Sequence, residues 1–308
     1  MGTPEFAVRP LEYLVANDYE VVAVYTQPDR TAGRGRALGV SPVKRAAEAH
    51  GLDIVQPPSL KDEGVVQALL AVRPEVIVIA AYGQFLTPQV LAAPAHRCLN
   101  IHPSLLPKYR GVSPVPAAIL EGDEFTGVSI MLPESAGWDT GPVIARAQIP
   151  VADRDTTGTL TDKLSRIGAQ LLVDVLPRWV RGQIEPQLQD HSLANYAKKI
   201  KKEDGDIEWT HPAVEVWRRV RAYSPWPGAY TRWQGRQLKI IDAVPLPASE
   251  RASPGQVVNV THSEAGFGVS TGAGVLGVIT LQLEGKRAMS AADFLRGQRD
   301  FGRAVLPS

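Results

Sequence analysis

Short apolar runs alternate with amphipathic segments through the first half of the chain. The clearest runs occupy residues 21–25 and 76–81, and a further strand signal follows at 99–102. Apolar residues recur at helical spacing in segments 43–49, 65–72, 88–92, 114–121 and 159–181. Strands that are apolar on both faces, with helices between them, are typical of a parallel sheet with crossover helices. The pattern therefore predicts an α/β domain built on a mostly parallel sheet.

The pattern changes near residue 190. Residues 191–206 are polar and charged, and short β-like runs follow, punctuated by glycine and proline at hairpin-like intervals. Such spacing suggests a small closed barrel. We therefore predict a catalytic domain at 1–190, a basic linker at 191–206 and a β domain at 207–308.

Composition narrows the class of protein. A chain of 308 residues is long enough for two domains, each with its own core. No apolar run reaches the length of a membrane span, and the first residues lack the basic and apolar regions of a secretory signal. The single cysteine, Cys98, cannot form an internal disulfide. We expect a cytoplasmic protein without a membrane partner.

Candidate chemistry is concentrated around Asn100 and His102. Residues two apart in a strand share one face, so an amide and an imidazole lie side by side before the chain breaks at Pro103. Ligands of open α/β sheets bind at the carboxyl ends of strands. Downstream, Asp139 lies in a glycine-bracketed loop, where the residue type alone fits a turn as well as an active site. Together these three groups can catalyse acyl-type transfer without a metal.

Several motifs carry a resemblance to a known family. Besides Asn100-x-His102-x-Ser104-Leu105-Leu106-Pro107 and Asp139-Thr140-Gly141, they are Gly2-Thr3-Pro4-Glu5-Phe6-Ala7, Thr26-Gln27-Pro28-Asp29-Arg30, Ser41-Pro42-Val43-Lys44, Ala81-Tyr82-Gly83, Tyr196-Ala197-Lys198-Lys199 and Ser224-Pro225-Trp226-Pro227-Gly228. The chain resembles the folate-dependent formyltransferase family over almost its whole length. The resemblance implies a Rossmann-like formyltransferase domain followed by an OB-like β-barrel, with Asn100, His102 and Asp139 as the catalytic group.

The resemblance also implies the reactants. The formyl donor is 10-formyltetrahydrofolate, the acceptor is the α-amino group of methionyl initiator tRNA, and the transfer is direct. The implied folate-binding residues are Ser104, Leu105, Leu106, Pro107, Tyr82, Gly83 and Phe85. No cluster of histidine, cysteine and carboxylate residues has zinc spacing, so we predict no metal. We expect the protein to act as a monomer.

Positive charge is clustered although the net charge is only +1. The two clusters are Arg30, Arg34, Arg36 and Lys44, and Lys198, Lys199, Lys201 and Lys202. Either cluster alone fits a solvated face, whereas the two together, beside the motifs above, favour an RNA-binding surface. We therefore expect both clusters to contact the tRNA.

Other functions remain open at this point. The same catalytic domain occurs in formyltransferases acting on an amino sugar or a purine precursor, and in a formyltetrahydrofolate hydrolase. The arginine loop, the lysine-rich linker and the C-terminal barrel favour tRNA over these small acceptors. A non-enzymatic alternative is an RNA-binding protein with a decayed catalytic domain. The joint presence of Asn100, His102 and Asp139 argues against that alternative.

The sequence departs from the family pattern at two places. The loop from Met131 to Asp139 is one residue longer than usual and contains Pro133. In addition, Thr3-Pro4 predicts a helix start with Thr3 as the cap, and the short apolar strand that normally precedes it is missing. Since the first strand of such a sheet pairs on both sides, we expect a widened space between segments 21–25 and 76–80.

Overall fold

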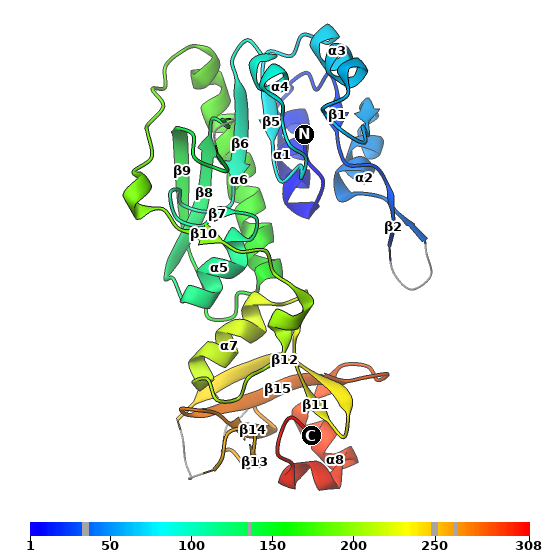
Figure 1. The fold of residues 1–308 in the computed structure, drawn as a ribbon, viewed down its shortest axis with the longest axis vertical. Coiled ribbons are helices and arrows are strands. Elements are labelled where there is room, and N and C mark those ends of the chain that lie inside the picture. Colours follow the sequence, from blue (N-terminus) through cyan, green and yellow to red (C-terminus); the bar gives the residue numbers. More distant parts are fainter. Residues whose placement is uncertain (33–36, 135–136, 248–251, 262–263) are drawn as a thin grey trace. The chain divides into compact units, whose positions relative to one another are not determined.

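The computed structural model describes residues 1–32, 37–134, 137–247, 252–261 and 264–308. These residues form two compact units (Figure 1). The first comprises Met1–Pro114, Phe125–Pro150 and Thr161–Ala197, and the second comprises Val115–Glu124, Val151–Leu160 and Lys198–Ser308. The domain limits at 190 and 207 stay a prediction.

The first unit is an α/β structure, as predicted. Its helices are η1 (Glu5–Ala7), α1 (Val8–Ala16), α2 (Pro42–Ala49), α3 (Glu63–Ala71), α4 (Pro88–Ala92), most of α6 (Thr157–Val180) and η2 (His191–Leu193). Its strands are β1 (Val24–Tyr25), β2 (Arg30–Ala32), β3 (Ala37–Gly39), β4 (Ile54–Val55), β5 (Ile77–Ile79), β6 (Cys98–His102), β7 (Arg110–Gly111), β8 (Phe125–Met131), β9 (Val143–Pro150) and β10 (Tyr196–Ala197).

Sheet pairing in this unit changes direction at β6. The main sheet has the order β5-β6-β8-β9, with β5 and β6 parallel and the later pairs antiparallel. Strand β6 is central, and Leu99 and Ile101 are buried in it, which explains its apolar character. The carboxyl ends of β5 and β6 therefore meet at one edge of the sheet, where Asn100 and His102 lie.

The helix starts indicated by the sequence are confirmed only in part. Ser41 caps α2 by accepting from the Lys44 N–H at 3.1 Å, with proline in the first turn. The prediction that Thr3 caps a helix was wrong, because η1 begins at Glu5 without a side-chain cap. The Thr3 hydroxyl instead donates to the Tyr82 carbonyl oxygen at 2.9 Å, which ties the N-terminal segment to the loop after β5.

The second unit contains an antiparallel sheet of six strands. These are β11 (Ala229–Trp233), β12 (Arg236–Leu246), β13 (Val257–Val258), β14 (Phe267–Ser270), β15 (Val275–Leu283) and β16 (Met289–Ser290). The helices of this unit are α5 (Pro114–Glu121), η3 (Lys202–Gly205), α7 (Ala213–Ala222), α8 (Ala291–Gly297) and η4 (Arg299–Arg303). The sheet has the order β11-β12-β15-β14-β13, with β16 beside β15. The expected barrel is thus a curled half-barrel.

Aromatic residues form much of the second core. Trp233 and Phe294 each pack edge-on against Phe301, with ring centroids 5.1 and 4.9 Å apart. Phe267 meets the same ring at 4.9 Å. Such pairs contribute about 0.5–1.5 kcal/mol beyond burial of their area, so helices α8 and η4 stabilise the open sheet from one side.

None of the helices in the described ranges is long and apolar enough to cross a membrane.

Candidate active site

A cavity of about 630 Å³ opens in the first unit at the carboxyl ends of β5 and β6. Asn100, His102 and Asp139 all line it, so the structure brings the three predicted catalytic residues together. Strand β6 supplies the first two, with Asn100 opposite Met131 and His102 opposite Ser129 on β8. The loop between β8 and β9 supplies Asp139. The longer loop before this residue lies partly outside the described residues.

The Asp139 carboxylate is the centre of the group. Its Oδ2 accepts the Gly111 N–H at 2.9 Å, and its Oδ1 lies 3.4 Å from Asn100 Nδ2. Oδ2 also lies 3.6 Å from His102 Nδ1, which is an ion-pair distance but too long for a hydrogen bond. Asp139 adopts a φ of 55°, a left-handed conformation that costs energy for a non-glycine residue. Surrounding bonds must therefore hold it in place.

The imidazole of His102 has a defined proton arrangement. Its Nε2 lies 2.9 Å from the Tyr109 carbonyl oxygen, and the residue is 4% exposed. Because a carbonyl oxygen can only accept, Nε2 carries the hydrogen in the neutral ring. Nδ1 is then the nitrogen that can take up a proton, and it faces Asp139. Tyr109 therefore fixes the tautomer, and Asp139 is placed to stabilise an imidazolium.

Gln189 is a site residue that the sequence analysis missed. Its Nε2 donates to the carbonyl oxygens of Asp139 and Gly141 at 2.8 and 2.7 Å. Its Oε1 accepts from the guanidinium of Arg110 at 2.7 and 3.2 Å. Arg110 is 2% exposed and also donates to His191 Nδ1 at 3.1 Å. This buried network holds the backbone of Asp139 in its left-handed conformation.

The segment that follows Gln189, residues 190–197, also supports the site. Strand β10 pairs in parallel with β7, and the Asn195 side chain accepts the Tyr109 N–H. Gly111 has a φ of 97°, and a Cβ there would lie 3.1 Å from the Ala197 carbonyl oxygen, so only glycine fits this approach. The first residues of the predicted linker are therefore part of the first unit. The motif that begins at Tyr196 lies here, but neither it nor any periodicity in 187–197 indicates the pairing with β7.

Replacing Gln189 with leucine should lower kcat because the Asp139 loop would lose two donors. Misplacement of a catalytic group by about 1 Å can cost ~10²-fold, so we expect a loss of about 10- to 100-fold in kcat. The KM for the formyl donor should change little, because we expect Asp139 to act on the reacting groups and not on the binding of that substrate. Steady-state kinetics with the acceptor saturating measure this split.

Two variants separate positioning from loss of folding. Gln189→Glu retains an acceptor for Arg110 but loses the donors to Asp139 and Gly141, so it should remain folded and slow. Gln187→Leu alters an exposed glutamine two residues away and should leave kcat unchanged. A Gln189→Glu enzyme with full kcat would show that the network serves only folding.

The predicted folate-binding residues divide into two groups. Tyr82, Gly83 and Phe85 line the cavity, in the loop after β5. Ser104, Leu105, Leu106 and Pro107 do not appear among its lining residues. They form a turn in which Leu106 N–H donates to the Ser129 hydroxyl at 3.0 Å and that hydroxyl donates to the Ser104 carbonyl oxygen at 2.8 Å. A direct role for these four residues in binding folate stays a prediction.

Two residues that line the cavity each carry a buried polar atom without a hydrogen-bond partner among the described residues. These atoms are the Gln84 Oε1 and the Tyr82 hydroxyl. Burial raises the pKa of Tyr82 to about 12, so its phenol stays protonated and can donate.

The structure describes the basic clusters only in part. Arg30 is exposed on β2, whereas Lys44 forms a 2.5 Å ion pair with Asp29, which lowers the pKa of that carboxyl. Arg34 and Arg36 lie outside the described residues. Lys198, Lys199, Lys201 and Lys202 are all exposed. Within the described ranges, no group of three metal-ligating side chains was found.

The fold and the site define a class of protein: an α/β group-transfer enzyme with an amide, an imidazole and a carboxylate at the carboxyl edge of its sheet. Residues 1–176 match the formyl transferase family, and residues 199–299 match the formyl transferase C-terminal domain. The chain belongs to the formyl transferase family.

Relatives of similar length carry a more specific name. The chain is 50% identical over 297 residues to the methionyl-tRNA formyltransferase of Chloroflexus aurantiacus, covering 96% of this chain and 95% of that one. It is also 50% identical over 301 residues to the methionyl-tRNA formyltransferase of Dehalococcoides mccartyi, covering 98% and 95%.

Solved structures share the fold at lower identity. An N-formyltransferase from Helicobacter canadensis, in complex with folinic acid and dTDP-3-aminofucose, aligns with a TM-score of 0.64 at 18% identity, over 94% of this chain and 97% of that one. HypX from Aquifex aeolicus, in complex with tetrahydrofolic acid, gives a TM-score of 0.59 at 20% identity. That alignment covers 84% of this chain and 44% of HypX.

Proposed function

We propose that the protein transfers the formyl group of 10-formyltetrahydrofolate to the α-amino group of methionyl initiator tRNA. The observation that carries the proposal is the convergence of Asn100, His102 and Asp139 on one cavity of about 630 Å³. Membership of the formyl transferase family and the two relatives named methionyl-tRNA formyltransferase support the acceptor. The reaction serves translation initiation and takes place in the cytoplasm.

The reaction is a direct transfer between two nitrogen atoms. The neutral amine attacks the formyl carbon, forms a new C–N bond and gives a tetrahedral oxyanion. Collapse of the oxyanion breaks the bond from that carbon to N10 of the folate. The attacking nitrogen loses one proton and N10 gains one, so the overall charge is conserved. No covalent intermediate with the enzyme is required.

Each of the three side chains has a separate role in this reaction. Among the described residues, the Asn100 Nδ2 has only long contacts, at 3.4 Å to Asp139 and 3.7 Å to the Met131 sulfur, so it can donate to the oxyanion. His102 Nδ1 accepts the proton that the amine releases and passes it to N10. Asp139 stabilises the imidazolium between these two steps.

Apolar side chains at the cavity mouth fit the acceptor. Phe85, Val112 and Trp138 line the cavity and are 54%, 58% and 67% exposed. Large exposed apolar groups gathered beside a cavity are typical of a binding surface. They suit the flexible, uncharged thioether side chain of methionine better than the hydroxyl-rich ring of an amino sugar.

The proposal is tested by offering the same labelled donor to different acceptors. The protein is incubated with 10-formyltetrahydrofolate labelled in the formyl group, together with methionyl initiator tRNA, with an amino sugar nucleotide, with a purine precursor or with water alone. We expect label on the aminoacyl group of the tRNA only. Label on another acceptor, or release of formate, would replace this proposal with one of the alternative formyl-transfer reactions.

We expect the four lysines at 198–202 to contribute to tRNA affinity. The change is Lys198→Ala, Lys199→Ala, Lys201→Ala and Lys202→Ala together, which removes exposed charges that have no ion-pair partner among the described residues. Each lysine that contacts a phosphate contributes about 1 to the slope of log affinity against log salt concentration. The quadruple variant should therefore bind tRNA more weakly and with a shallower salt dependence.

A surface lysine elsewhere provides the matched control. Lys286 is exposed in the second unit, so Lys286→Ala changes the net charge without touching the cluster. Binding titrations at several salt concentrations compare the two proteins. An unchanged salt slope in the quadruple variant would mean that the lysine cluster is only a solvated face.

A further inference from the structure

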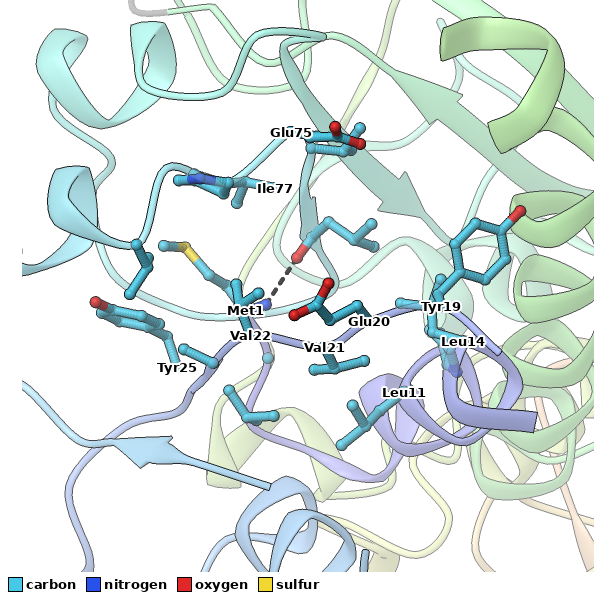
Figure 2. A pocket seen from close by; sticks show the side chains of 18 of the residues that line it. Met1, Leu11, Leu14, Tyr19, Glu20, Val21, Val22, Tyr25, Glu75 and Ile77 are labelled. Carbon is cyan, nitrogen blue, oxygen red and sulfur yellow. Dashed lines mark hydrogen bonds between the residues drawn. The ribbon is translucent and has the colours of Figure 1, made fainter. Parts of the chain in front are cut away.

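Two features of the first unit take no part in the reaction proposed above. One is a cavity of about 710 Å³ whose wall includes residues of segments 21–25 and 76–80, where the sequence predicts a widened space. The Met1 amine donates to the Val78 carbonyl oxygen at 2.7 Å there (Figure 2). Among the described residues, this cavity shares no lining residue with the one that holds Asn100. The other feature is His191, an exposed imidazole that bonds to the buried network supporting Asp139.

Arg110 is a buried cation whose hydrogen bonds go to neutral acceptors. The residue is 2% exposed, and its Nε and Nη2 donate to Gln189 Oε1 at 3.2 and 2.7 Å. Nη2 also donates to His191 Nδ1 at 3.1 Å. Because a guanidinium has no acceptor atom, Nδ1 must offer its lone pair, and the hydrogen of the neutral ring lies on Nε2. A buried charged donor is destabilised when an acceptor is withdrawn, so Arg110 depends on the neutral form of this ring.

Protonation of the His191 ring removes this acceptor. Nδ1 then carries a hydrogen, and an imidazolium lies 3.1 Å from a guanidinium of the same charge. Imidazole groups ordinarily change charge between pH 5 and 8. Since His191 is open to solvent, a moderate fall in pH can break its bond to Arg110.

The loss of this bond reaches the catalytic carboxylate through two residues. Arg110 holds Gln189 by its Oε1, and Gln189 Nε2 donates to the carbonyl oxygens of Asp139 and Gly141 at 2.8 and 2.7 Å. Asp139 needs these bonds because its φ of 55° is unfavourable for a residue with a side chain. A shift of Arg110 therefore loosens the loop that carries the carboxylate.

We propose that His191 is a positioning residue whose neutral ring holds the Asp139 loop in place and whose protonation slows formyl transfer. This role rests on the proposed formyl transfer. The neutral ring is the form that completes the network, so the contribution of His191 to the rate is fully present at pH 8. It is lost as the pH falls through the range in which the ring takes up a proton.

The other titratable groups beside this contact do not change charge in that range. Among the described residues they are Asp190, which precedes η2, and Tyr196 on β10. Asp190 Oδ1 accepts the Ser192 hydroxyl at 2.7 Å and the Ser192 N–H at 3.0 Å, and these bonds lower the pKa of that carboxyl. Asp190 therefore stays ionised, and because it is exposed, solvent weakens its attraction for a protonated ring. A phenol is neutral at pH 8 and below.

The test compares single-turnover rates of His191→Asn and of the unaltered protein at pH 8 and pH 5.5. Asparagine places Oδ1 where Nδ1 lies and accepts from Arg110 at both pH values, because an amide does not titrate there. At pH 5.5 an ordinary imidazole is mostly protonated. If the protonated ring makes transfer about tenfold slower, the ratio of the variant rate to the unaltered rate should rise from about 1 to about 5. The titrations of His102 and of the acceptor amine are common to both proteins and cancel in this ratio.

Two further variants complete the comparison. His50 is an exposed histidine at the end of α2, so His50→Asn removes a titrating ring without touching the network, and its ratio should stay near 1 at both pH values. His191→Leu removes the acceptor outright. It should be about tenfold slow even at pH 8, and its rate should depend less on pH than that of the unaltered protein.

A measurement without substrate separates this role from the proposed function. The Gly111 N–H donates to Asp139 Oδ2 at 2.9 Å, so its NMR resonance in ¹⁵N-glycine-labelled protein reports the position of the carboxylate. We expect this resonance to move between pH 8 and pH 5.5 together with the ring protons of His191, and this movement to be absent from His191→Asn.

The two measurements overturn different statements. A rate ratio that is the same at both pH values, or a Gly111 resonance that moves identically in the two proteins, would overturn the positioning role of His191. Movement of the resonance with His191, in a protein that does not formylate methionyl-tRNA at pH 8, would overturn the proposed function and leave the coupling between His191 and Asp139 in place.

Discussion

Replacing His102 with alanine is expected to lower kcat by about 10²–10⁴-fold, the usual contribution of a general acid–base group. The reason is geometric. Nε2 is committed to the Tyr109 carbonyl oxygen, so Nδ1 is the nitrogen that moves the proton between the amine and N10. Donor binding should be nearly unchanged, because the residues that we expect to bind the folate in this cavity, Tyr82, Gly83 and Phe85, lie in the loop after β5. Single-turnover kinetics and a donor-binding titration measure the two effects separately.

The variant His102→Gln distinguishes catalysis from packing. Alanine removes the donor to the buried Tyr109 carbonyl oxygen, and an unpaired buried acceptor costs about 1–3 kcal/mol of stability. Glutamine restores an N–H donor near the position of Nε2 but provides no base at the position of Nδ1. We expect His102→Gln to melt close to the unaltered protein and to remain as slow as His102→Ala. Recovery of activity in His102→Gln would assign the role of His102 to structure alone.

The main features of the sheet and the placement of Asn100 and His102 side by side could be predicted from the sequence because they depend on local pattern. Apolar runs marked β1, β5 and β6, and alternation along β6 placed Asn100 and His102 on one face. Their position at the carboxyl end of a parallel strand followed from the general behaviour of such sheets. Neither inference required knowledge of long-range contacts.

The support of the site could not be predicted, because it depends on contacts between distant segments. Gln189 reaches Asp139 across 50 residues, and the Tyr109 carbonyl oxygen that fixes the His102 tautomer belongs to the backbone. A polar residue in a polar segment gives no signal of such burial. Thr3 was misread for a related reason, since its hydroxyl bonds to the distant Tyr82 carbonyl and not to its own helix.

The C-terminal unit shows another limit of pattern reading. The regularly spaced short strands suggested a closed barrel, whereas the structure contains a curled antiparallel half-barrel, because strand spacing alone does not determine whether the edges of a sheet meet. In the strand order of the described residues, β11 and β13 stand at opposite ends. The sheet stays open, and Phe294 and Phe301 pack against Trp233 on one side of it, which the spacing of the strands does not predict.

Replacing Asp139 with asparagine should lower kcat by about 10²–10³-fold while the protein stays folded, the loss typical of a preorganised electrostatic group. The new amide can keep its oxygen toward the Gly111 N–H, where Asp139 Oδ2 now accepts at 2.9 Å. Its NH₂ group would then face Asn100 Nδ2, which is also a donor. The negative charge that stabilises an imidazolium at His102 would be lost.

Comparison with other variants makes the Asp139 result specific. Gln189→Glu leaves the carboxylate in place but releases its loop, so it should be less impaired than Asp139→Asn. If the two act through the same carboxylate, the double variant should be about as slow as Asp139→Asn alone, because neighbouring groups in one network are not additive. Thermal melting and the donor KM serve as controls for folding and cavity shape. An Asp139→Asn enzyme within about threefold of full kcat would exclude a charged partner for His102 and leave Asn100 and the imidazole as the whole of the catalytic group.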